Sequence, residues 1–222
     1  MRSRAEPAPA SLTAADARRL EACLAGDGVA VIPTDTVYGL ACNPDSERAL
    51  DRIYELKRRP PAKPAAVMFF ALGAALSALI ELGERELEAV EALLPGPVTL
   101  LLPNRRRRFL RACGSAATPA DGGLLGLRIP ELTGPLAALR DVRAPAAQSS
   151  ANFSGSSDAR AFLDVPSALR EGVDLTLDGG ELAGVASTIV DLSEYELAGR
   201  WRVLREGPLG RSAVRQRLGK AR

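Results

Sequence analysis

A short apolar run that ends in a polar loop constrains the fold of this chain more than any other feature. Residues 29–32 are Val, Ala, Val and Ile, and they stand between a glycine and Pro33. Four apolar residues bounded in this way predict a buried strand. Thr34, Asp35 and Thr36 follow the proline, so hydroxyls and a carboxylate lie at the carboxyl end of that strand. Open α/β sheets bind ligands at such ends, so we expect a binding site here.

Helical and extended patterns alternate along the rest of the chain. We expect helices over residues 12–25, 46–56, 73–80, 84–94, 134–140 and 211–218. We expect further strands over residues 65–70, 98–102, 124–129, 144–148, 173–177, 187–192 and 200–204. The segment from Ser149 to Asn152 is expected to be a loop after strand 144–148. This alternation predicts an α/β fold, and the strand-rich C-terminal part predicts a mixed sheet.

The composition predicts one compact domain. The chain has 222 residues, of which 46% are hydrophobic and 25% charged, enough for a core with an ordinary charged surface. We place the domain at residues 12–208, with a disordered segment at residues 1–11 and a basic, helical tail at residues 209–222. We expect no membrane span, because no apolar run is long enough, and no secretory signal, because residues 1–10 lack an apolar core.

Cysteine and histidine usage narrows the possible chemistry. Cys23, Cys42 and Cys113 lie far apart without the spacing of metal ligands, which predicts reduced thiols and a cytoplasmic protein. Histidine is absent from the chain, so a histidine-based catalytic triad and histidine metal ligation are both excluded.

Arginine is concentrated in two places, although the net charge is only +2. Residues 105–108 are four consecutive arginines, and residues 200–222 hold seven arginines and one lysine against a single glutamate. Such runs can meet phosphate groups, and they can equally be solvated surface charge. We expect both runs to contact RNA or a partner without a role in catalysis. Residues 81–91, with five glutamates and one arginine, predict the solvated face of a helix.

Three polar clusters are candidates for a binding site, and each also has a simpler explanation. Lys57 and Arg59 follow a predicted helix end, where basic residues interact favourably with the helix dipole and are exposed to solvent. Ser150 and Asn152 are also common turn formers. Arg128 stands between apolar residues of a predicted strand. It therefore needs a buried acceptor, which is either a protein carboxylate or a substrate one.

Seven motifs occur in a fixed order along the chain. They are Pro33 to Leu40, Lys57-x-Arg59-Pro60 with Lys63-Pro64, Pro95 to Leu100, Arg128-Ile129-Pro130, Ser150-x-Asn152 with Ser154-Gly155, Ser187 to Asp191, and Arg205-Glu206-Gly207. In this order they resemble the YrdC-like threonylcarbamoyl-AMP synthases of the TsaC type, over roughly residues 12–208. The Lys-x-Arg and Ser-x-Asn motifs together separate the active synthases of that family from a related group that lacks them.

The resemblance implies an open, twisted, mixed β-sheet flanked by helices around a concave basic cleft. It also implies an enzyme that joins L-threonine, bicarbonate and ATP into threonylcarbamoyl-AMP and releases pyrophosphate. Mg²⁺ would accompany ATP, and no resident metal site is expected. The product would pass to a threonylcarbamoyl-transferase complex that modifies tRNA. Contact of the protein itself with tRNA is expected from the arginine runs.

The resemblance also assigns roles to individual residues. The residues implied in catalysis are Lys57, Arg59, Ser150 and Asn152. With Arg205, these residues would hold the phosphates of ATP. Those implied in binding threonine are Thr34, Arg128 and Ser187.

Several positions depart from the pattern of the family. Pro61 stands where many members have serine or asparagine, Ala65 replaces a leucine, and Leu124 stands where threonine is common. Met68 or Phe69 occupies the region where some members place a histidine that contacts threonine. At these positions we expect substrate contacts that differ from those of other members.

Two other functions are compatible with parts of the sequence. A non-catalytic YrdC-like module could bind RNA on the same basic surface without consuming ATP. A serine hydrolase could use Ser149 or Ser150 as nucleophile with Lys57 as base, although the chain lacks a G-x-S-x-G nucleophile elbow.

Overall fold

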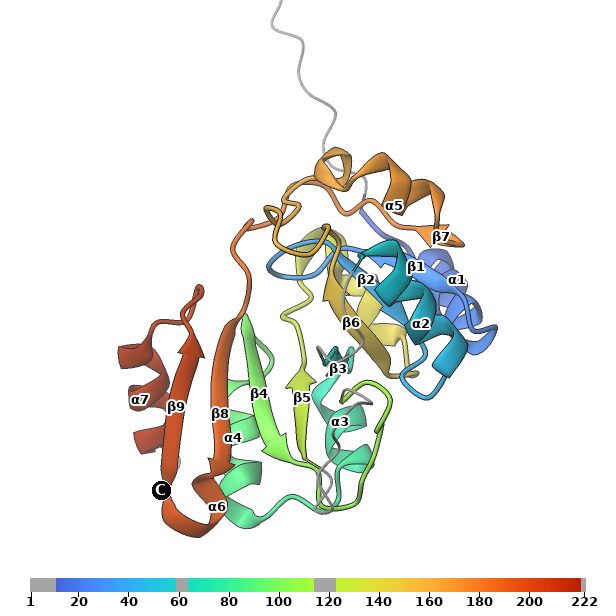
Figure 1. Ribbon diagram of the computed structural model, residues 1–222. Coiled ribbons are helices and arrows are strands. Elements are labelled where there is room, and N and C mark those ends of the chain that lie inside the picture. Colours follow the sequence, from blue (N-terminus) through green and yellow to red (C-terminus); the bar gives the residue numbers. More distant parts are fainter. Residues whose placement is uncertain (1–10, 59–63, 114–122, 221–222) are drawn as a thin grey trace, which may run out of the picture.

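The computed structural model describes residues 11–58, 64–113 and 123–220, and one mixed sheet runs through them (Figure 1). Within these residues the strand order is β7-β1-β2-β6-β3-β5-β4-β8-β9. The strands are β1 (Val29–Ile32), β2 (Gly39–Cys42), β3 (Ala66–Met68), β4 (Val98–Pro103), β5 (Leu124–Arg128), β6 (Ala146–Ser150), β7 (Leu175–Thr176), β8 (Thr188–Glu194) and β9 (Arg200–Arg205). The pairs β1–β7, β3–β5 and β4–β8 are parallel and the others antiparallel. This open mixed sheet confirms the predicted α/β fold class.

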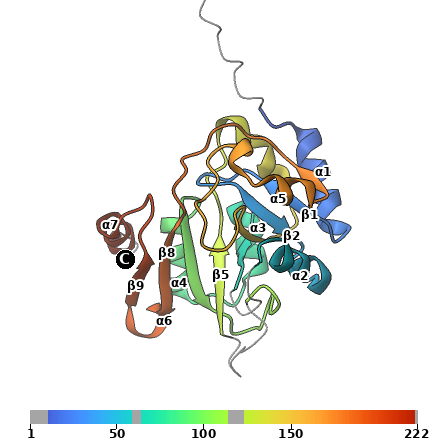
Figure 2. The ribbon, with the colours of Figure 1, turned by 45° about the horizontal axis from the view of Figure 1, so that its top comes forward.

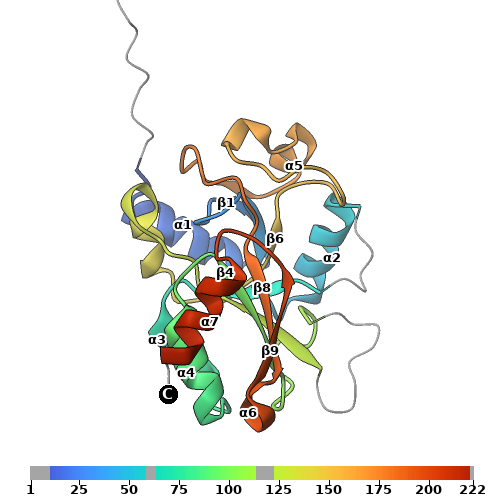
Figure 3. The same cartoon turned by 90° about the vertical axis from the view of Figure 1, so that its left-hand side faces the viewer.

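Helices pack against the sheet in separate groups (Figures 2 and 3). The helices are α1 (Ala14–Ala25), α2 (Glu47–Leu56), α3 (Leu72–Ala78), α4 (Glu84–Leu93), α5 (Ser167–Glu171), α6 (Tyr195–Ala198), α7 (Arg211–Lys220) and the 3₁₀ helices η1 (Gly134–Asp141) and η2 (Phe162–Asp164). Helices α3, α4 and α7 lie on the same side of strands β4, β8 and β9 in Figure 3, and α4 contacts both β4 and α7. Helices α1 and α2 pack against β1 and β2 at the other end of the sheet.

Predicted and observed elements coincide where the sequence carries clear start and stop signals. The strand predicted at residues 29–32 is β1 with the same ends, and all four of its residues are buried. Thr13 caps α1 in a capping box with Asp16. Ser46 caps α2, because its hydroxyl accepts a hydrogen bond from the backbone N–H of Ala49 at 3.2 Å.

Strand β2 and the extent of β6 differ from the sequence prediction. Residues 39–42 form β2 between β1 and β6, where the sequence predicts the end of a polar loop. Because Gly39 pairs with Ser150 and Leu40 with Ser149, both serines belong to β6 and not to the predicted loop. β2 has no β-branched residue, so it lacks the usual strand signal and depends on burial between two neighbouring strands. The helix predicted at residues 134–140 is the 3₁₀ helix η1 at residues 134–141.

The acidic segment at residues 81–91 is not a purely solvated helix face, which corrects the sequence prediction. Glu86 is 0% exposed and accepts hydrogen bonds from Nη1 and Nη2 of Arg105 at 2.6 and 2.8 Å. It also accepts from the backbone N–H of Gly83 at 3.1 Å, so one carboxylate caps α4 and binds a loop arginine. The side chain of Arg108 lies 3.9 Å from Glu81. Two of the four consecutive arginines therefore have carboxylate neighbours.

The basic C-terminal segment packs onto the domain. Residues 211–220 form α7, which confirms the predicted helix, and Val214 and Leu218 are buried against the core. The hydroxyl of Thr188 donates a hydrogen bond to the carbonyl of Leu209 at 2.8 Å, which fixes the start of this segment to β8. Of residues 1–11, which are expected to be disordered, residues 1–10 lie outside the described residues. Among the described helices, none has both the length and the apolar character needed to cross a membrane.

Candidate active site

A pocket of 510 Å³ opens on one face of the central strands, and the alternation of side chains along these strands decides what lines it. Thr99 and Leu101 of β4 point into the pocket, whereas Leu100 between them is fully buried in the core. The same period of two brings six residues from four adjacent strands to the pocket: Gln148 and Ser150, Ala66, Gly126 and Arg128, and Thr99. Its volume is in the range of small-molecule sites.

Lys57, Ser150 and Asn152 form a hydrogen-bonded cluster at the β6 end of this region. Lys57 is the C-cap of α2, and its Nζ donates to the carbonyl of Ser150, to the carbonyl of Asn152 at 2.9 Å and to Asn152 Oδ1 at 3.2 Å. The Ser150 hydroxyl donates to the same Asn152 Oδ1 at 2.6 Å. Asn152 Nδ2 donates to the carbonyl of Ser156 at 2.5 Å, which fixes the orientation of the amide. The structure thus brings together three of the four residues implied in catalysis.

The position of Lys57 corrects one sequence prediction. A lysine just after a helix is expected to be exposed, but Lys57 is only 1% exposed. Its ammonium holds the loop after β6 against the end of α2, and the backbone N–H of Ser154 donates back to the carbonyl of Lys57 at 3.2 Å. Removal of this side chain therefore affects the fold as well as any ligand contact.

Arg128 is a buried cation that lines the pocket, and a protein carboxylate already neutralises part of its charge. The side chain is 2% exposed, and its Nη2 forms an ion pair with Asp35 Oδ1 and donates to Thr36 Oγ1 at 2.8 Å. Burial lowers the pKa of Arg128 below its ordinary value, and the adjacent Asp35 opposes part of this shift. The second oxygen of Asp35 accepts from the backbone N–H of Glu131 at 3.0 Å. Of the two acceptors that the sequence left open, the structure contains the protein one.

Thr34 shapes the loop that carries Asp35 and Thr36. It is 0% exposed, and its hydroxyl donates to the carbonyl of Val37 at 2.7 Å while it accepts from the backbone N–H of Thr36 at 3.2 Å. Thr34 lines a neighbouring pocket of 360 Å³ that also includes Asp35 and Glu131, whereas Thr36 and Val37 line the main pocket. Its hydroxyl therefore acts on the main pocket through the turn that it stabilises.

Ser187 and Arg205 lie together at the β8–β9 side of the pocket. Arg205 donates from Nε and Nη2 to the carbonyl of Ser187 at 3.0 and 2.8 Å, so its guanidinium is held in place although the residue is exposed. The hydroxyls of Ser187 and Thr99 are 2.8 Å apart and share a hydrogen bond. Strands β4 and β8 are parallel neighbours, which explains why residues 88 positions apart in the sequence meet here.

Several predicted residues fall outside the described residues or have other surroundings. Arg59, with Pro61 and Lys63, lies in the segment that the structure does not describe. Ala65 and Leu124 both line the pocket, so these departures from the family pattern lie where substrate would bind.

Some functional candidates were missed because their exposure to the pocket depends on strand register. Gln148, Leu204 and Asp158 line the pocket, yet no local motif marks them. Cys113 also lines it, and burial raises the pKa of its thiol to about 11, so it is a poor nucleophile at neutral pH. Met68 and Phe69 are core residues at 0% and 2% exposure.

Sequence comparison identifies the family. The profile of the Sua5–YciO–YrdC family, whose description reads "Telomere recombination", matches residues 22–207. The chain belongs to this family. Among similar proteins of the family, the threonylcarbamoyl-AMP synthase of Xanthomonas campestris is 35% identical over 167 residues, which are 74% of this chain and 86% of the relative. The threonylcarbamoyl-AMP synthase of Rattus norvegicus is 33% identical over 191 residues, 83% of this chain.

Solved structures of the Sua5–YciO–YrdC family share the fold. The crystal structure of Pyrococcus abyssi Sua5 with L-threonine aligns with a TM-score of 0.77 and 26% identity, covering 94% of this chain and 58% of that protein. Escherichia coli YciO aligns with a TM-score of 0.73 and 23% identity, covering 90% of this chain and 93% of that protein. The chain spans only 64% of the length of the rat relative, so relatives of that size contain additional segments.

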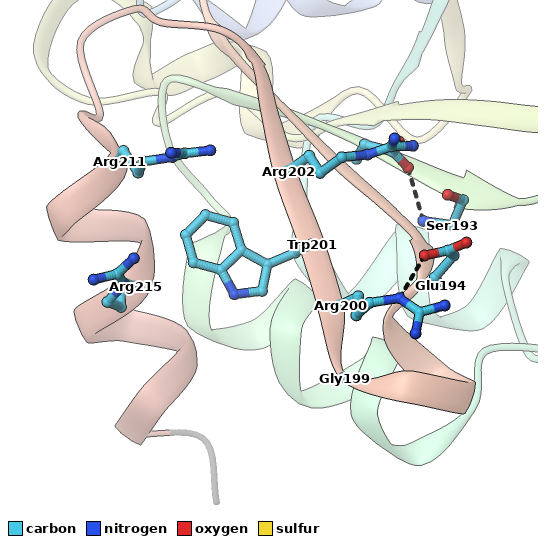
Figure 4. A pocket seen from close by; sticks show the side chains of 9 residues that line it. Ser193, Glu194, Gly199, Arg200, Trp201, Arg202, Arg211 and Arg215 are labelled. Atoms are coloured by element: carbon cyan, nitrogen blue, oxygen red, sulfur yellow. Dashed lines mark hydrogen bonds and ion pairs between the residues drawn. The ribbon is translucent and has the colours of Figure 1, made fainter.

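A second pocket, of 410 Å³, lies between β9 and α7 on the edge of this family fold (Figure 4). Figure 4 shows Arg211 and Arg215 of α7 and Trp201 of β9 facing one another. The side chains of Arg200 and Arg202 extend from the opposite face of β9. Arg200 forms an ion pair with Glu194 and Arg202 forms one with Asp191, each at 2.7 Å. In the described part of the chain, Arg211 and Arg215 have no carboxylate partner.

Proposed function

We propose that this protein is a threonylcarbamoyl-AMP synthase. The reaction joins L-threonine, bicarbonate and ATP into threonylcarbamoyl-AMP and releases pyrophosphate and water. The threonine amine first forms a carbamate with the carbon of bicarbonate. A carbamate oxygen then attacks the α-phosphorus of ATP, and the bond from that phosphorus to the bridging oxygen of pyrophosphate breaks.

One observation carries this proposal. Ser150 of the Lys57–Ser150–Asn152 cluster and Arg128 of β5 line one pocket, in a chain 33–35% identical to proteins named threonylcarbamoyl-AMP synthase. Two separate polar centres suit a substrate pair in which each partner carries its own anionic group. Phosphoryl transfer needs chiefly positioned cations and donors, which is what these residues offer.

We assign the phosphates of ATP to the Lys57 cluster and to Arg205. The amide of Asn152 and the hydroxyl of Ser150 are held in fixed orientations, which supports this assignment, and Arg59 belongs to the group by its motif. We assign the threonine carboxylate to Arg128, with Ser187 and Thr34 shaping that side of the pocket. Asp35 holds the guanidinium of Arg128 in place before substrate binds, so little side-chain freedom is lost on binding.

Mg²⁺ enters this scheme as part of the ATP substrate. It prefers phosphate oxygens with at most one or two carboxylates from the protein. Asp158 is a carboxylate that lines the pocket and could contact such an ion or its water shell. We place the reaction in the cytoplasm, in agreement with the free thiols of Cys23, Cys42 and Cys113.

Pyrophosphate release tests the proposed function. We expect release from ATP only when L-threonine and bicarbonate are both present, and an adenylate product with the mass of threonylcarbamoyl-AMP. Release without threonine, or no release at all, would overturn the proposal. RNA binding by a protein that does not consume ATP would support the non-catalytic module, and labelling of Ser149 or Ser150 by a serine-directed electrophile would support a hydrolase.

We further propose that the protein contacts tRNA at the β9–α7 pocket and passes its product to a threonylcarbamoyl-transferase complex. Arg211 and Arg215 are four residues apart on α7, so their like charges repel unless an anion lies between them. Trp201 offers an indole on which a base can stack, and stacking beside cations is typical of single-stranded nucleic acid sites. Arg105 and Arg108 are less suited to this role, because Glu86 and Glu81 lie beside them.

A further inference from the structure

Gln148 is a buried polar residue of the main pocket without a partner. It lies on β6 two residues before Ser150, lines the pocket and is 8% exposed. Within the described residues, its side-chain amide makes no hydrogen bond. The amide oxygen and nitrogen keep some exposure to the pocket, so a ligand there can reach both of them. An amide that no protein group occupies and that faces a pocket is available to accept from and donate to a ligand.

The sheet register places Gln148 between the two polar centres. Gln148 pairs with Ala66 of β3, and Ala66 lies beside Gly126 of β5, whose side-chain position is 3.5 Å from Ala66 Cα. Ser150 lies two residues beyond this row in one direction, and Arg128 lies two residues beyond Gly126 in the other. Two residues of a strand span about 7 Å. In the row formed by Gln148, Ala66 and Gly126, Gln148 therefore has the side chain that can form hydrogen bonds.

Gly39 fixes how the side chain of Gln148 lies. Gly39 is opposite Ser150 on β2, and a Cβ at this position would clash with Nε2 of Gln148 and lie 3.1 Å from its Cδ. The amide thus rests against bare backbone. A methyl group at position 39 would push the amide toward the pocket, because the far end of a flexible side chain moves more easily than the sheet.

We infer that Gln148 binds the carbamoyl group that links threonine to the α-phosphate, an inference that rests on the proposed function. With the threonine carboxylate on Arg128 and the phosphates near Lys57, the carbamoyl group lies between the two centres, over the row that contains Gln148. A carbamate carries an N–H donor and oxygen acceptors, and a carboxamide can match both. The phosphates and the threonine carboxylate only accept hydrogen bonds, and we assign them to the cationic side chains.

The inference is tested with Gln148→Leu, with Gln216→Leu as the matched control. Gln216 is the other glutamine of the chain and lies exposed on α7. We expect Gln148→Leu to lower kcat/KM for threonine and for bicarbonate about tenfold, the size of one lost hydrogen bond, with the KM for ATP unchanged. Gln148→Glu should lower both further, because its carboxylate repels the carbamate. Gln216→Leu should match the wild type.

Two further measurements separate the alternatives. L-2-Aminobutyrate is threonine without its hydroxyl, so an equal loss with both amino acids supports contact with the carbamoyl group. A loss confined to threonine would place Gln148 on the hydroxyl and overturn the inference. Gly39→Ala should reduce activity in the wild type but have little added effect in the Gln148→Leu background. An active wild type with unaffected Gln148→Leu overturns this inference alone, whereas an inactive wild type overturns the proposed function with it.

Discussion

At the scale of single residues, Lys57 and Arg128 are both buried cations, but their partners differ. Lys57 donates to backbone and side-chain oxygens at the end of β6 and in the loop after it. Arg128 is paired with Asp35, so the field at its end of the pocket is weaker. The Arg128 end of the pocket therefore suits a ligand group of low charge, such as a single carboxylate.

Lys57→Ala is expected to lower the free energy of unfolding by about 2–4 kcal/mol and to abolish pyrophosphate release. The change leaves the carbonyls of Ser150 and Asn152 without their donor, and each unsatisfied buried group costs about 1–3 kcal/mol. Urea denaturation followed by circular dichroism measures the loss. Glu55→Ala, at an exposed position of α2, serves as the control. A Lys57→Ala protein as stable as the wild type would contradict the assigned contacts.

Arg128→Lys is expected to raise the KM for threonine at least tenfold while the KM for ATP stays within about twofold. An ammonium cannot hold Asp35 and Thr36 and at the same time present a planar pair of donors to a carboxylate. Steady-state titration of each substrate measures the split. A defect confined to ATP would mean that the two ends of the pocket are assigned the wrong way round.

At the scale of elements, the sequence predicts those that carry their own signals and misses those that depend on neighbours. β1 is a run of apolar residues between Gly28 and Pro33, and α2 has a serine cap, so both were predictable. β2 contains no residue that favours strands, and its existence depends on pairing with β1 and β6. Because that pairing also sets the register of β6, the exposure of Gln148 to the pocket could not be predicted from local sequence.

Asp174 ties three elements together and gives the stability a defined pH dependence. Its carboxylate accepts from the backbone N–H of Val29 at 2.8 Å and from Arg52 at 2.6 Å, and these contacts, the first above all, lower its pKa. A carboxyl group whose pKa is lowered by folding stabilises the protein above its unfolded pKa, and this contribution is lost as the pH falls through the folded pKa.

Asp174→Asn should therefore unfold at a lower urea concentration than the wild type at pH 7. The difference between the two should begin to shrink as the pH falls below about 4, the pKa of an unfolded aspartate, and should be lost as the pH falls through the lower pKa of the folded state. Asp45→Asn, an exposed change, is the control. A difference that stays constant between pH 7 and pH 3 would show that the charge of Asp174 is not what stabilises these contacts.

At the scale of the whole molecule, β9 connects two sites with different properties. Its C-terminal residue, Arg205, lines the main pocket, and Trp201 near its other end lines the pocket against α7. Helix α7 is part of the folded domain, since Val214 and Leu218 are buried, so its arginines are held at fixed positions. A ligand on the β9–α7 pocket would therefore be bound on the same rigid sheet as the candidate active site without entering it.

Replacing Arg211 and Arg215 together with glutamine is expected to weaken tRNA binding and reduce its salt dependence, while pyrophosphate release persists. Each phosphate contact contributes about 0.7–0.9 to the slope of log affinity against log salt, so two lost contacts should reduce the slope by roughly 1.4–1.8. An in vitro transcribed tRNA, titrated at several salt concentrations, gives this slope. Arg217→Gln on the same helix is the matched control, because Arg217 is exposed but does not line the pocket. An unchanged slope in the double variant would show that these arginines are solvated surface charge, and a loss of turnover would mean that α7 contributes to catalysis.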